Sequence, residues 1–588
     1  MTDTARNPGL PDNWPVLSMK DTIAFLTSPG TPFEMETVDV RGVPTRVYKS
    51  TPSNLRVILD AGRAFGARDF IVYEGERLNF ENHYRAVTAF ARVLADRYGV
   101  RKGDHVTLAM RNFPEWSIVF WATVALGAVI VPLNAWGTAD ELEYGISDSG
   151  SKVAVVDGER LERIAPGLPS LKLAGVVAVR TPANLRGGAD AFEDLIGSPD
   201  GYASLPGDSF PDVAIDPDDD ATIFYTSGTT GRPKGALGTH RNMCTNLINA
   251  MFGPARAMMR RGEIPQPPDP AGPQRVMLLS VPLFHATGCH SILVANYATG
   301  ARVVMMHRWN PERALQLIEQ EKVNTFGGVP AMVWQVIESP DFDKYDTSSV
   351  DGVGYGGAPS APELVARIKQ LFPKSAPSNG YGLTETSSIT TMNSAEDYVN
   401  RPDSCGPAVP VCDVKAVNEK GEAVGVNEIG ELWIKGPNIV KCYWNKPEAT
   451  AAAITEGGWF HSGDLVRIDE EGFIYILDRA KDMLIRGGEN IYCVEVESVL
   501  YAFEGVMDAA VVGIPHRVLG EEVGAIVQVA PGKEIDEAQL KAHVGKLLAA
   551  FKVPVKIEIR TEPLPRNANG KILKGTLRDD MKKYATAV

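Results

Sequence analysis

The chain has 588 residues, which is too long for a single hydrophobic core, so three or four structural units are expected at about 150 residues each. Its 44% apolar and 22% charged residues are typical of a globular protein. The formal net charge of −14 argues against a nucleic-acid-binding protein, which usually carries a basic surface, and against general attraction to anionic membranes. A local basic patch, and with it peripheral membrane contact, stays open.

The first residues lack the basic and then apolar pattern of a secretory signal, so a cytoplasmic protein is expected. Ser117 to Leu133 is uncharged and nearly long enough to span a bilayer. Gly127 and Pro132 interrupt this run, which favours a buried helix followed by a buried strand. The 6 cysteines and 9 histidines show no metal-ligand spacing, which predicts reduced thiols and no structural zinc.

The N-terminal part of the chain changes character near residue 50. Residues 1–50 show no period and predict an extension lying on the surface. Strand and helix patterns then alternate, which predicts a parallel α/β sheet. The expected elements are a strand at 106–110, a helix at 115–126, a strand at 128–132, a helix at 139–149 and a strand at 153–157.

Tyr225 to Gly235 reads YTSGTTGRPKG and directly follows an apolar strand. Its three glycines allow backbone N–H groups to turn inward, and such groups form a concavity that binds anions. Hydroxyl groups and one lysine complete a polyphosphate site, although the spacing is not that of a Walker loop. The predicted phosphate-binding residues are Thr226, Ser227, Gly228, Thr229, Thr230, Gly231 and Lys234.

After this loop, Thr239 is expected to cap a helix over 240–251, with His240 and Arg241 facing solvent. Residues 254–273 are rich in proline and predict an irregular surface loop. Further strands are expected at 276–281 and 302–306, and a strand that passes into a glycine-rich turn over 353–359. Helices are expected at 311–322 and 363–372. Short strands over 401–476 predict a small β-subdomain, and a compact α+β unit follows from residue 478.

Several later motifs also lie where strands end, which is where α/β sheets bind ligands. Gly357, Ala358 and Pro359 offer backbone atoms to an adenine edge. In the turn Asn379-Gly380-Tyr381-Gly382, the Tyr381 ring either lies against the purine or belongs to the core. Thr384 and Glu385 place a hydroxyl and a carboxylate at the end of this turn as candidate catalytic residues, and a carboxylate beside a polyphosphate normally acts through Mg²⁺. Asp464 and Arg479 are candidates to hold the two sides of a ribose, and Lys571 ends a glycine-containing loop.

Together and in this order, the motifs resemble the adenylate-forming enzymes: acyl-CoA synthetases, peptide-synthetase adenylation domains and luciferases. The resemblance covers residues 50–580 and implies an α/β fold. It implies an N-terminal extension (1–50), a large AMP-binding domain of parallel αβ sheets with a small β-subdomain (51–477), and a mobile α+β C-terminal domain (478–588) hinged at Lys481.

The resemblance also implies a reaction in two halves. A carboxylate first attacks the α-phosphate of ATP, and CoA then takes the acyl group from acyl-AMP. Lys571 is implied to act in the first half, Glu385 and Thr226 to hold magnesium, and His285 to gate the acyl channel. The loop Arg486-Gly487-Gly488 is implied to guide the CoA arm in the second half.

Residues 478–497, DRAKDMLIRGGENIYCVEVE, are most similar to CoA-forming fatty-acyl or aryl-acid ligases, except that Cys493 replaces a common proline or serine. The candidate acyl pocket has no fixed cation, which favours an apolar acid, aliphatic or aromatic. Its candidate residues are Thr287, Cys289, Tyr355 and Val329. Two alternatives stay open: transfer of the acyl group to a carrier protein, and a catalytically silent nucleotide-binding protein. The sequence also allows a homodimer.

Overall fold

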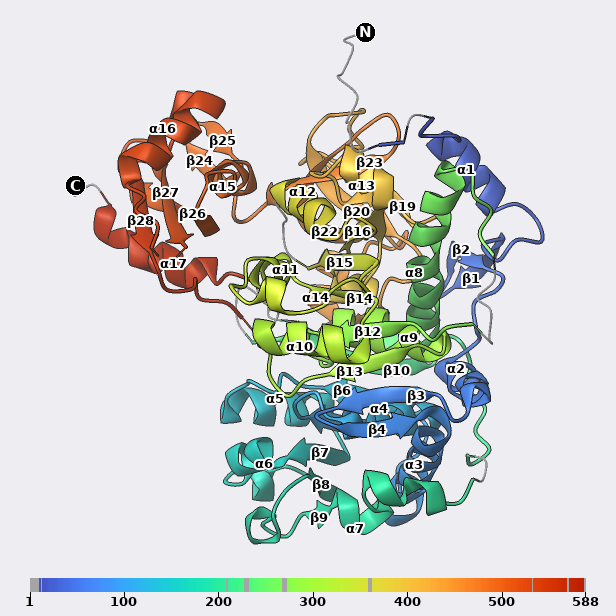
Figure 1. The fold of residues 1–588 in the computed structure, drawn as a ribbon. Coiled ribbons are helices and arrows are strands. Elements are labelled where there is room, and N and C mark those ends of the chain that lie inside the picture. Colours follow the sequence, from blue (N-terminus) through green and yellow to red (C-terminus); the bar gives the residue numbers. More distant parts are fainter. Residues whose placement is uncertain are drawn as a thin grey trace.

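The computed structural model describes residues 10–11, 13–207, 210–226, 232–266, 272–357, 362–530, 532–567 and 571–585. They form a large body and a smaller C-terminal unit, drawn in red to one side of it (Figure 1). The chain passes from one to the other after strand β23 (Phe473–Arg479). Mixed α/β layers around parallel sheets confirm the predicted fold class.

The first large sheet is mostly parallel and contains the phosphate-loop strand. Its strand order is β21-β11-β10-β6-β5-β7-β8-β9, with the two strands at the β21 end running antiparallel to their neighbours. The central strands are buried along their whole length, as expected for a sheet covered on both faces. The bounds are β5 (His105–Ala109), β6 (Val129–Pro132), β7 (Val153–Asp157), β8 (Gly175–Val179), β9 (Asp190–Ala191), β10 (Asp220–Thr226), β11 (Lys234–Thr239) and β21 (Cys442–Tyr443).

The uncharged run Ser117 to Leu133 forms all but the first three residues of helix α4 (Pro114–Ala125) and then strand β6. Every residue of α4 is buried, which explains why the helix carries no polar face and reads like a membrane span. The prediction of a buried helix followed by a buried strand is confirmed. Across the described ranges, no helix combines the length and apolar character needed to cross a membrane.

The second large sheet has the order β17-β16-β15-β14-β12-β13-β3-β4. Glycines occupy its central strands because neighbouring backbones approach closely. A Cβ on Gly327 would lie 1.5 Å from the Gly354 oxygen, and one on Gly356 would lie 2.3 Å from the Gly380 oxygen. The bounds are β3 (Asp69–Tyr73), β4 (Glu76–Asn79), β12 (Val276–Leu279), β13 (Arg302–Met305), β14 (Thr325–Gly328), β15 (Gly352–Gly356), β16 (Ala376–Tyr381) and β17 (Thr391–Ser394).

Helices cover both large sheets. In Figure 1 they include α5 and α6 beside the first sheet and α10 to α12 beside the second. Their bounds are α2 (Leu55–Gly62), α3 (Phe80–Arg92), α5 (Ala139–Ser149), α6 (Gly158–Ile164), α7 (Phe192–Ile196), α9 (Ala295–Ala298), α10 (Pro311–Glu321), α11 (Pro330–Ile337), α12 (Pro362–Leu371), α13 (Ala395–Asn400) and α14 (Pro447–Ala453).

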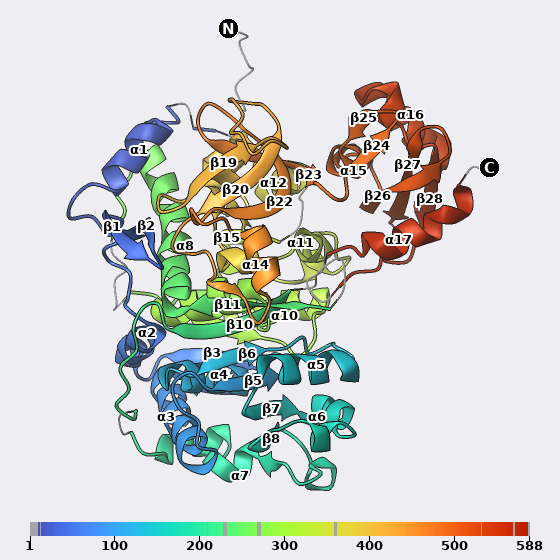
Figure 2. The same cartoon turned by 180° about the vertical axis from the view of Figure 1, so that it is seen from behind.

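A five-stranded antiparallel β-subdomain lies between helix α8 (His240–Arg260) and the C-terminal unit (Figure 2). Its strands are β18 (Gly406–Pro407), β19 (Asp413–Val417), β20 (Gly430–Lys435), β22 (Phe460–Ile468) and β23. The C-terminal unit has its own apolar core. Its elements are β24 (Leu484–Arg486), β25 (Glu489–Ile491), α15 (Cys493–Tyr501), β26 (Val506–His516), β27 (Gly520–Val529), α16 (Glu537–Leu547), β28 (Lys556–Arg560) and α17 (Lys574–Met581).

The N-terminal extension is more ordered than its sequence pattern suggests. It contains helix α1 (Met19–Leu26) and a hairpin of β1 (Met35–Val40) and β2 (Val43–Tyr48). Phe33 and Tyr48 are buried in the main apolar core, and Phe33 packs edge-on against Phe252 of α8. These elements are too short to show a clear period, so the sequence does not reveal them.

Helix α8 corrects two expectations. It continues past residue 251, through Pro254, to Arg260, so the predicted loop over 254–273 is wrong for its first seven residues. Packing holds this end in place, because buried Arg260 contacts buried Asp397 at 2.9 Å. His240 does not face solvent: it is fully buried, and its Nδ1 accepts a hydrogen bond from the Leu55 N–H at 3.2 Å.

Candidate active site

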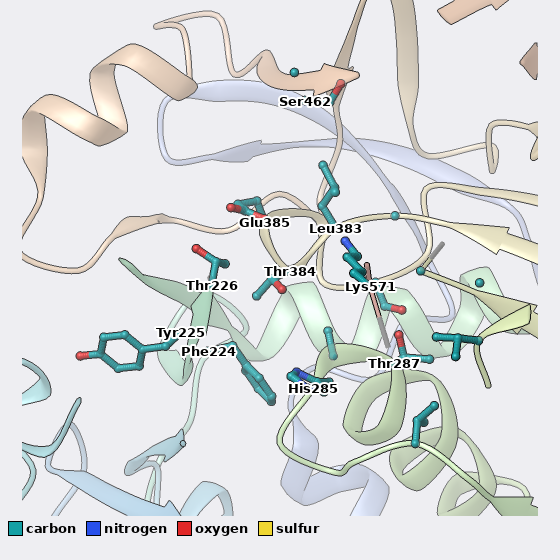
Figure 3. A pocket seen from close by; sticks show the side chains of 18 of the residues that line it. Phe224, Tyr225, Thr226, His285, Thr287, Leu383, Thr384, Glu385, Ser462 and Lys571 are labelled. Carbon is teal, nitrogen blue, oxygen red and sulfur yellow. The ribbon is translucent and has the colours of Figure 1, made fainter. Parts of the chain in front are cut away.

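A cavity of about 420 Å³ lies where strands of both large sheets end, beside the β-subdomain and the C-terminal unit. This is the position at which α/β sheets bind ligands. Figure 3 shows side chains from distant parts of the sequence around it. The lining includes Phe224, Thr226, Lys234, Phe284, His285, Thr287, Val329, Met332, Gly357, Gly382, Leu383, Thr384, Glu385, Tyr443, Ser462, Arg479, Lys481 and Lys571.

The predicted phosphate end brings Thr226, Lys234 and Glu385 to one cavity. Thr226 ends β10 and Lys234 begins β11, and the Thr226 hydroxyl donates to the Lys234 carbonyl at 3.3 Å. The Glu385 carboxylate accepts a hydrogen bond from the Tyr443 hydroxyl at 2.7 Å. Burial, with the Glu385 charge beside it, raises the pKa of Tyr443, so this phenol stays a neutral donor. Ser227, Gly228, Thr229, Thr230 and Gly231 lie outside the described residues.

The same end has the donors that Mg²⁺ prefers: the Glu385 carboxylate and the hydroxyls of Thr226 and Thr384. In the described part of the chain, no group of three or more His, Cys, Asp and Glu side chains forms a metal cage. One carboxylate with neighbouring hydroxyls suits a magnesium ion that also binds substrate phosphates. These residues therefore fit the metal that the sequence resemblance implies.

At the predicted ribose end, Asp464 of β22 lies opposite Arg479 of β23. Arg479 Nε is 2.6 Å from Asp464 Oδ1, and the Tyr381 hydroxyl donates to Asp464 Oδ2 at 2.6 Å. Arg479 lines the cavity, and Asp464 is buried directly after the lining residues Ser462 and Gly463, with Tyr381 buried beside it. Of the two alternatives for Tyr381, the structure favours the core, because its ring packs in the apolar cluster of the β-subdomain.

The predicted adenine-binding turns are only partly described. Gly357 lines the cavity with a left-handed φ of 74°. Gly382 also lines it, and a Cβ there would lie 1.3 Å from the Ser388 carbonyl, so a larger residue does not fit. Asn379 and Gly380 lie in β16, paired with β15, rather than on the wall. Ala358 and Pro359 lie outside the described residues.

Lys571 of the C-terminal unit projects into this cavity and remains accessible to water within it (Figure 3). The loss of bulk water around it lowers the pKa of Lys571, and the charge on Arg479 lowers it further. Asp464 and Glu385 act in the opposite direction. The backbone is held nearby, because the Lys571 N–H donates to Asn567 Oδ1 at 3.0 Å.

Below Lys571 in Figure 3 lie His285 and Thr287, which the sequence predicts at the acyl end of the cavity. Thr287 and Val329 line the cavity, as predicted, together with the apolar side chains of Phe284 and Met332. Burial lowers the pKa of His285 to about 3, with the Lys571 charge adding to the effect, so this imidazole is neutral at pH 7.

The structure places two other pocket candidates away from the cavity wall. The side chain of Tyr355 is on the opposite face of β15 from the neighbouring glycines, and its hydroxyl lies 2.9 Å from the Tyr398 hydroxyl. Cys289 is fully buried in the main core.

The predicted CoA loop and hinge occupy different places. Arg486 ends β24, and Gly487 and Gly488 form the turn to β25. None of these residues lines the cavity, and Arg486 pairs with Glu522 at 2.7 Å. Lys481 lines the cavity within a turn in which the Asp482 N–H donates to the Arg479 carbonyl at 2.9 Å.

Comparison with known proteins identifies the family. Residues 59–444 match the AMP-binding enzyme family, and residues 495–571 match the C-terminal domain of AMP-binding enzymes. The chain belongs to the AMP-binding enzyme family. The prediction made from its motifs is confirmed.

The relatives of this AMP-binding enzyme include acid–CoA ligases. It is 35% identical over 504 residues to a feruloyl-CoA synthase from Amycolatopsis sp, which covers 86% of this chain and 94% of the relative. It is also 35% identical over 505 residues to the long-chain-fatty-acid–CoA ligase FadD13 of Mycobacterium tuberculosis, covering 84% and 92%. ATP-bound MatB from Rhodopseudomonas palustris has a similar structure, with a TM-score of 0.76, 29% identity, and coverage of 90% and 99%.

Sequence reasoning missed several wall residues of the AMP-binding enzyme. Phe224 and Met332 read as ordinary core positions, since nothing local distinguishes an apolar wall from an apolar core, and Leu383 lies in a predicted turn without a chemical group that indicates a role. Tyr443 belongs to a two-residue strand, too short to give a pattern. The one sequence feature that marks Tyr443 is the short polar and aromatic run KCYWN, residues 441–445. In the structure this run pairs with β11, the strand that follows the phosphate loop.

Proposed function

We propose that this AMP-binding enzyme is an AMP-forming acid–CoA ligase that acts on an apolar carboxylic acid. In the first half-reaction a carboxylate oxygen bonds to the α-phosphorus of ATP and pyrophosphate leaves. In the second, the CoA thiolate bonds to the acyl carbon of acyl-AMP and AMP leaves. The products are acyl-CoA, AMP and pyrophosphate.

One observation carries the proposal: Lys571 of the C-terminal unit enters the cavity that Glu385, Thr226 and Lys234 line from the large body. Two anions meet when a carboxylate approaches an α-phosphate, and a fixed cation between them lowers the energy of the transition state. We assign this role to Lys571. Lys234 and Thr226 lie where they can hold the departing pyrophosphate.

Thr226 and Glu385 would hold magnesium, with Thr384 beside them. When bound, the ion neutralises phosphate charge and orients the phosphate groups. Asp464 and Arg479 are assigned to the ribose, with Tyr381 fixing the Asp464 carboxylate from behind. The glycines at 357 and 382 leave room for the base.

The acyl end supports an apolar acid, because Phe284, Val329 and Met332 line it and the His285 beside them is neutral. A second carboxylate would find no fixed cation among these residues. One relative acts on an aryl acid and another on a fatty acid, as their names state, and both are 35% identical to this chain. Both acid classes therefore belong in the test.

The arrangement fits the first half-reaction. We propose that residues 478–588 then rotate about Lys481, which withdraws Lys571 and brings Arg486, Gly487 and Gly488 to the cavity for CoA. Movements of loops and domains that complete or open an active site are common in enzymes. The domain boundaries at residues 50 and 477 are part of this proposal.

The test is a panel of straight-chain, branched and aryl carboxylic acids, scored by AMP release with and without CoA. We expect AMP release that depends on both an apolar acid and CoA. Turnover only with an acyl-carrier protein would instead establish a carrier-loading enzyme. Absence of pyrophosphate exchange with every acid would establish a silent nucleotide-binding protein.

A further inference from the structure

Residues 438–444, which we call the strap, connect two parts of the phosphate end of the cavity. On one side, the Val440 N–H donates to the Glu385 carbonyl at 2.9 Å, and Asn438 Nδ2 donates to the Thr386 carbonyl at 3.0 Å. On the other side, the Trp444 N–H donates to the Gly235 carbonyl at 2.7 Å. The strap therefore ties the Thr384–Thr386 turn to the strand that closes the phosphate loop.

Tyr443 is the side chain of the strap that contacts both functional groups. Its hydroxyl donates to Glu385 Oε1 at 2.7 Å, and the Lys234 ammonium lies 5.2 Å from the centre of its ring. Its backbone is fixed as well, since it pairs with Ala236 and its N–H donates to Thr450 Oγ1 at 2.9 Å. One aromatic side chain thus sets the orientation of an anion and the place of a cation.

We infer that Tyr443 is a positioning residue for the magnesium and phosphate end of the reaction. This inference rests on the proposed function, in which Glu385 holds the metal and Lys234 holds phosphate. The phenol engages one Glu385 oxygen, which fixes the carboxylate so that its second oxygen can bind the ion. Partners of metal ligands typically contribute 10–100-fold in metal affinity because they orient the ligand.

Two substitutions distinguish the effects of the two contacts that Tyr443 makes. Tyr443→Phe removes the hydroxyl bond to Glu385 and keeps the ring beside Lys234. Tyr443→Leu removes both. A cation beside an aromatic face gains about 0.5–2 kcal/mol, which corresponds to roughly 2- to 30-fold in binding. The first variant therefore reports on the metal and the second also on the phosphate.

The matched control is Tyr98→Phe. It removes a phenol-to-carboxylate bond of the same kind, from Tyr98 to Asp190 Oδ2 at 2.6 Å, and neither residue lines the cavity. Any general effect of losing such a bond appears equally in this control. An effect specific to the magnesium end does not.

The experiment titrates Mn²⁺, as a stand-in for Mg²⁺, into enzyme with a non-hydrolysable ATP analogue and follows bound metal by electron paramagnetic resonance. We expect Tyr443→Phe to weaken metal binding about 10-fold or more, with no change in Tyr98→Phe. In pyrophosphate exchange, the Mg²⁺ concentration for half-maximal rate should rise by the same factor, and excess Mg²⁺ should restore kcat. Unchanged metal binding, or a loss of kcat that excess Mg²⁺ does not restore, would overturn the inference.

A double-substitution cycle tests whether the effect passes through Glu385. In a Glu385→Gln background, Tyr443→Phe should change metal binding by less than about twofold, because the group that it orients is already altered. Full additivity would overturn the inference. Failure of the wild-type enzyme to bind metal with the nucleotide, or to exchange pyrophosphate, would instead count against the proposed function.

Discussion

Arg479 and Asp464 form an ion pair of 2.6 Å between neighbouring strands at the edge of the cavity. Tyr381 donates to the second Asp464 oxygen, so both oxygens of this carboxylate, which is 3% exposed, already have partners. A buried charge held in this way keeps its orientation before any ligand arrives. We propose that the ribose of ATP binds to an Asp464 carboxylate whose orientation is already fixed.

Asp464→Asn tests this assignment. The substitution keeps the shape of the side chain and removes its charge. Hydrogen bonds to charged groups contribute about 1.5–3 kcal/mol, so KM for ATP should rise roughly 10- to 100-fold while kcat at saturating ATP changes little. Pyrophosphate exchange against ATP concentration measures both. Asp190→Asn, which alters an ion pair with Arg97 away from the cavity, is the control, and an unchanged KM for ATP in Asp464→Asn would count against the ribose site.

Lys481→Pro tests the hinge. Proline fixes φ near −65° and restricts the preceding residue, so it should hinder rotation at this position. We expect thioester formation from supplied acyl-AMP to fall by more than about tenfold, with adenylation affected much less. Lys481→Ala separates the loss of the side chain, which lines the cavity, from the stiffened backbone. If Lys481→Pro and Lys481→Ala form thioester at the same rate, the hinge is not at Lys481.

The pH dependence of adenylation should reflect Lys571. Desolvation and the Arg479 charge lower its pKa, and the neutral form of a lysine appears as pH rises through the pKa. The kcat/KM for ATP, which reports the free enzyme, should therefore fall on an alkaline limb that lies below the ordinary lysine value of about 10.4. Lys571→Arg keeps its charge over this range and should lack that limb, even though its rate is lower. If wild type and Lys571→Arg show the same alkaline limb, that limb reports the titration of another group.

Local patterns predicted the parts of the site that depend on neighbours in sequence. Glycines and hydroxyls after a strand indicated the phosphate loop, and the positions of Thr226, Lys234 and Glu385 on one cavity agree with that interpretation. The contacts that were missed depend on distant pairing. Tyr443 reaches Glu385 because β21 pairs with β11, and Tyr381 enters the core because β-subdomain strands pack around it.

The same reason explains the corrected elements. Pro254 marks a helix end in most sequences, but α8 continues because Arg260 reaches Asp397 on α13. His240 looks like a surface residue in the sequence because it begins a helix. In the structure it is buried because the start of α2 packs over it. Tyr355 looked like a wall residue because the sequence shows only that it precedes a glycine turn, whereas strand β15 turns its side chain to the opposite face.

The central claim is that Lys571 serves the first half-reaction and leaves for the second. The direct measurement compares Lys571→Ala with wild type in two assays: pyrophosphate exchange, and thioester formation from supplied acyl-AMP and CoA. The control is Lys582→Ala, which changes an exposed lysine of the C-terminal unit that pairs with Asp579 at 2.6 Å and does not line the cavity. We expect Lys571→Ala to lose about 10²–10³ in adenylation rate, the scale of one transition-state donor, and to keep thioester formation nearly intact. Equal losses in both assays would contradict this claim.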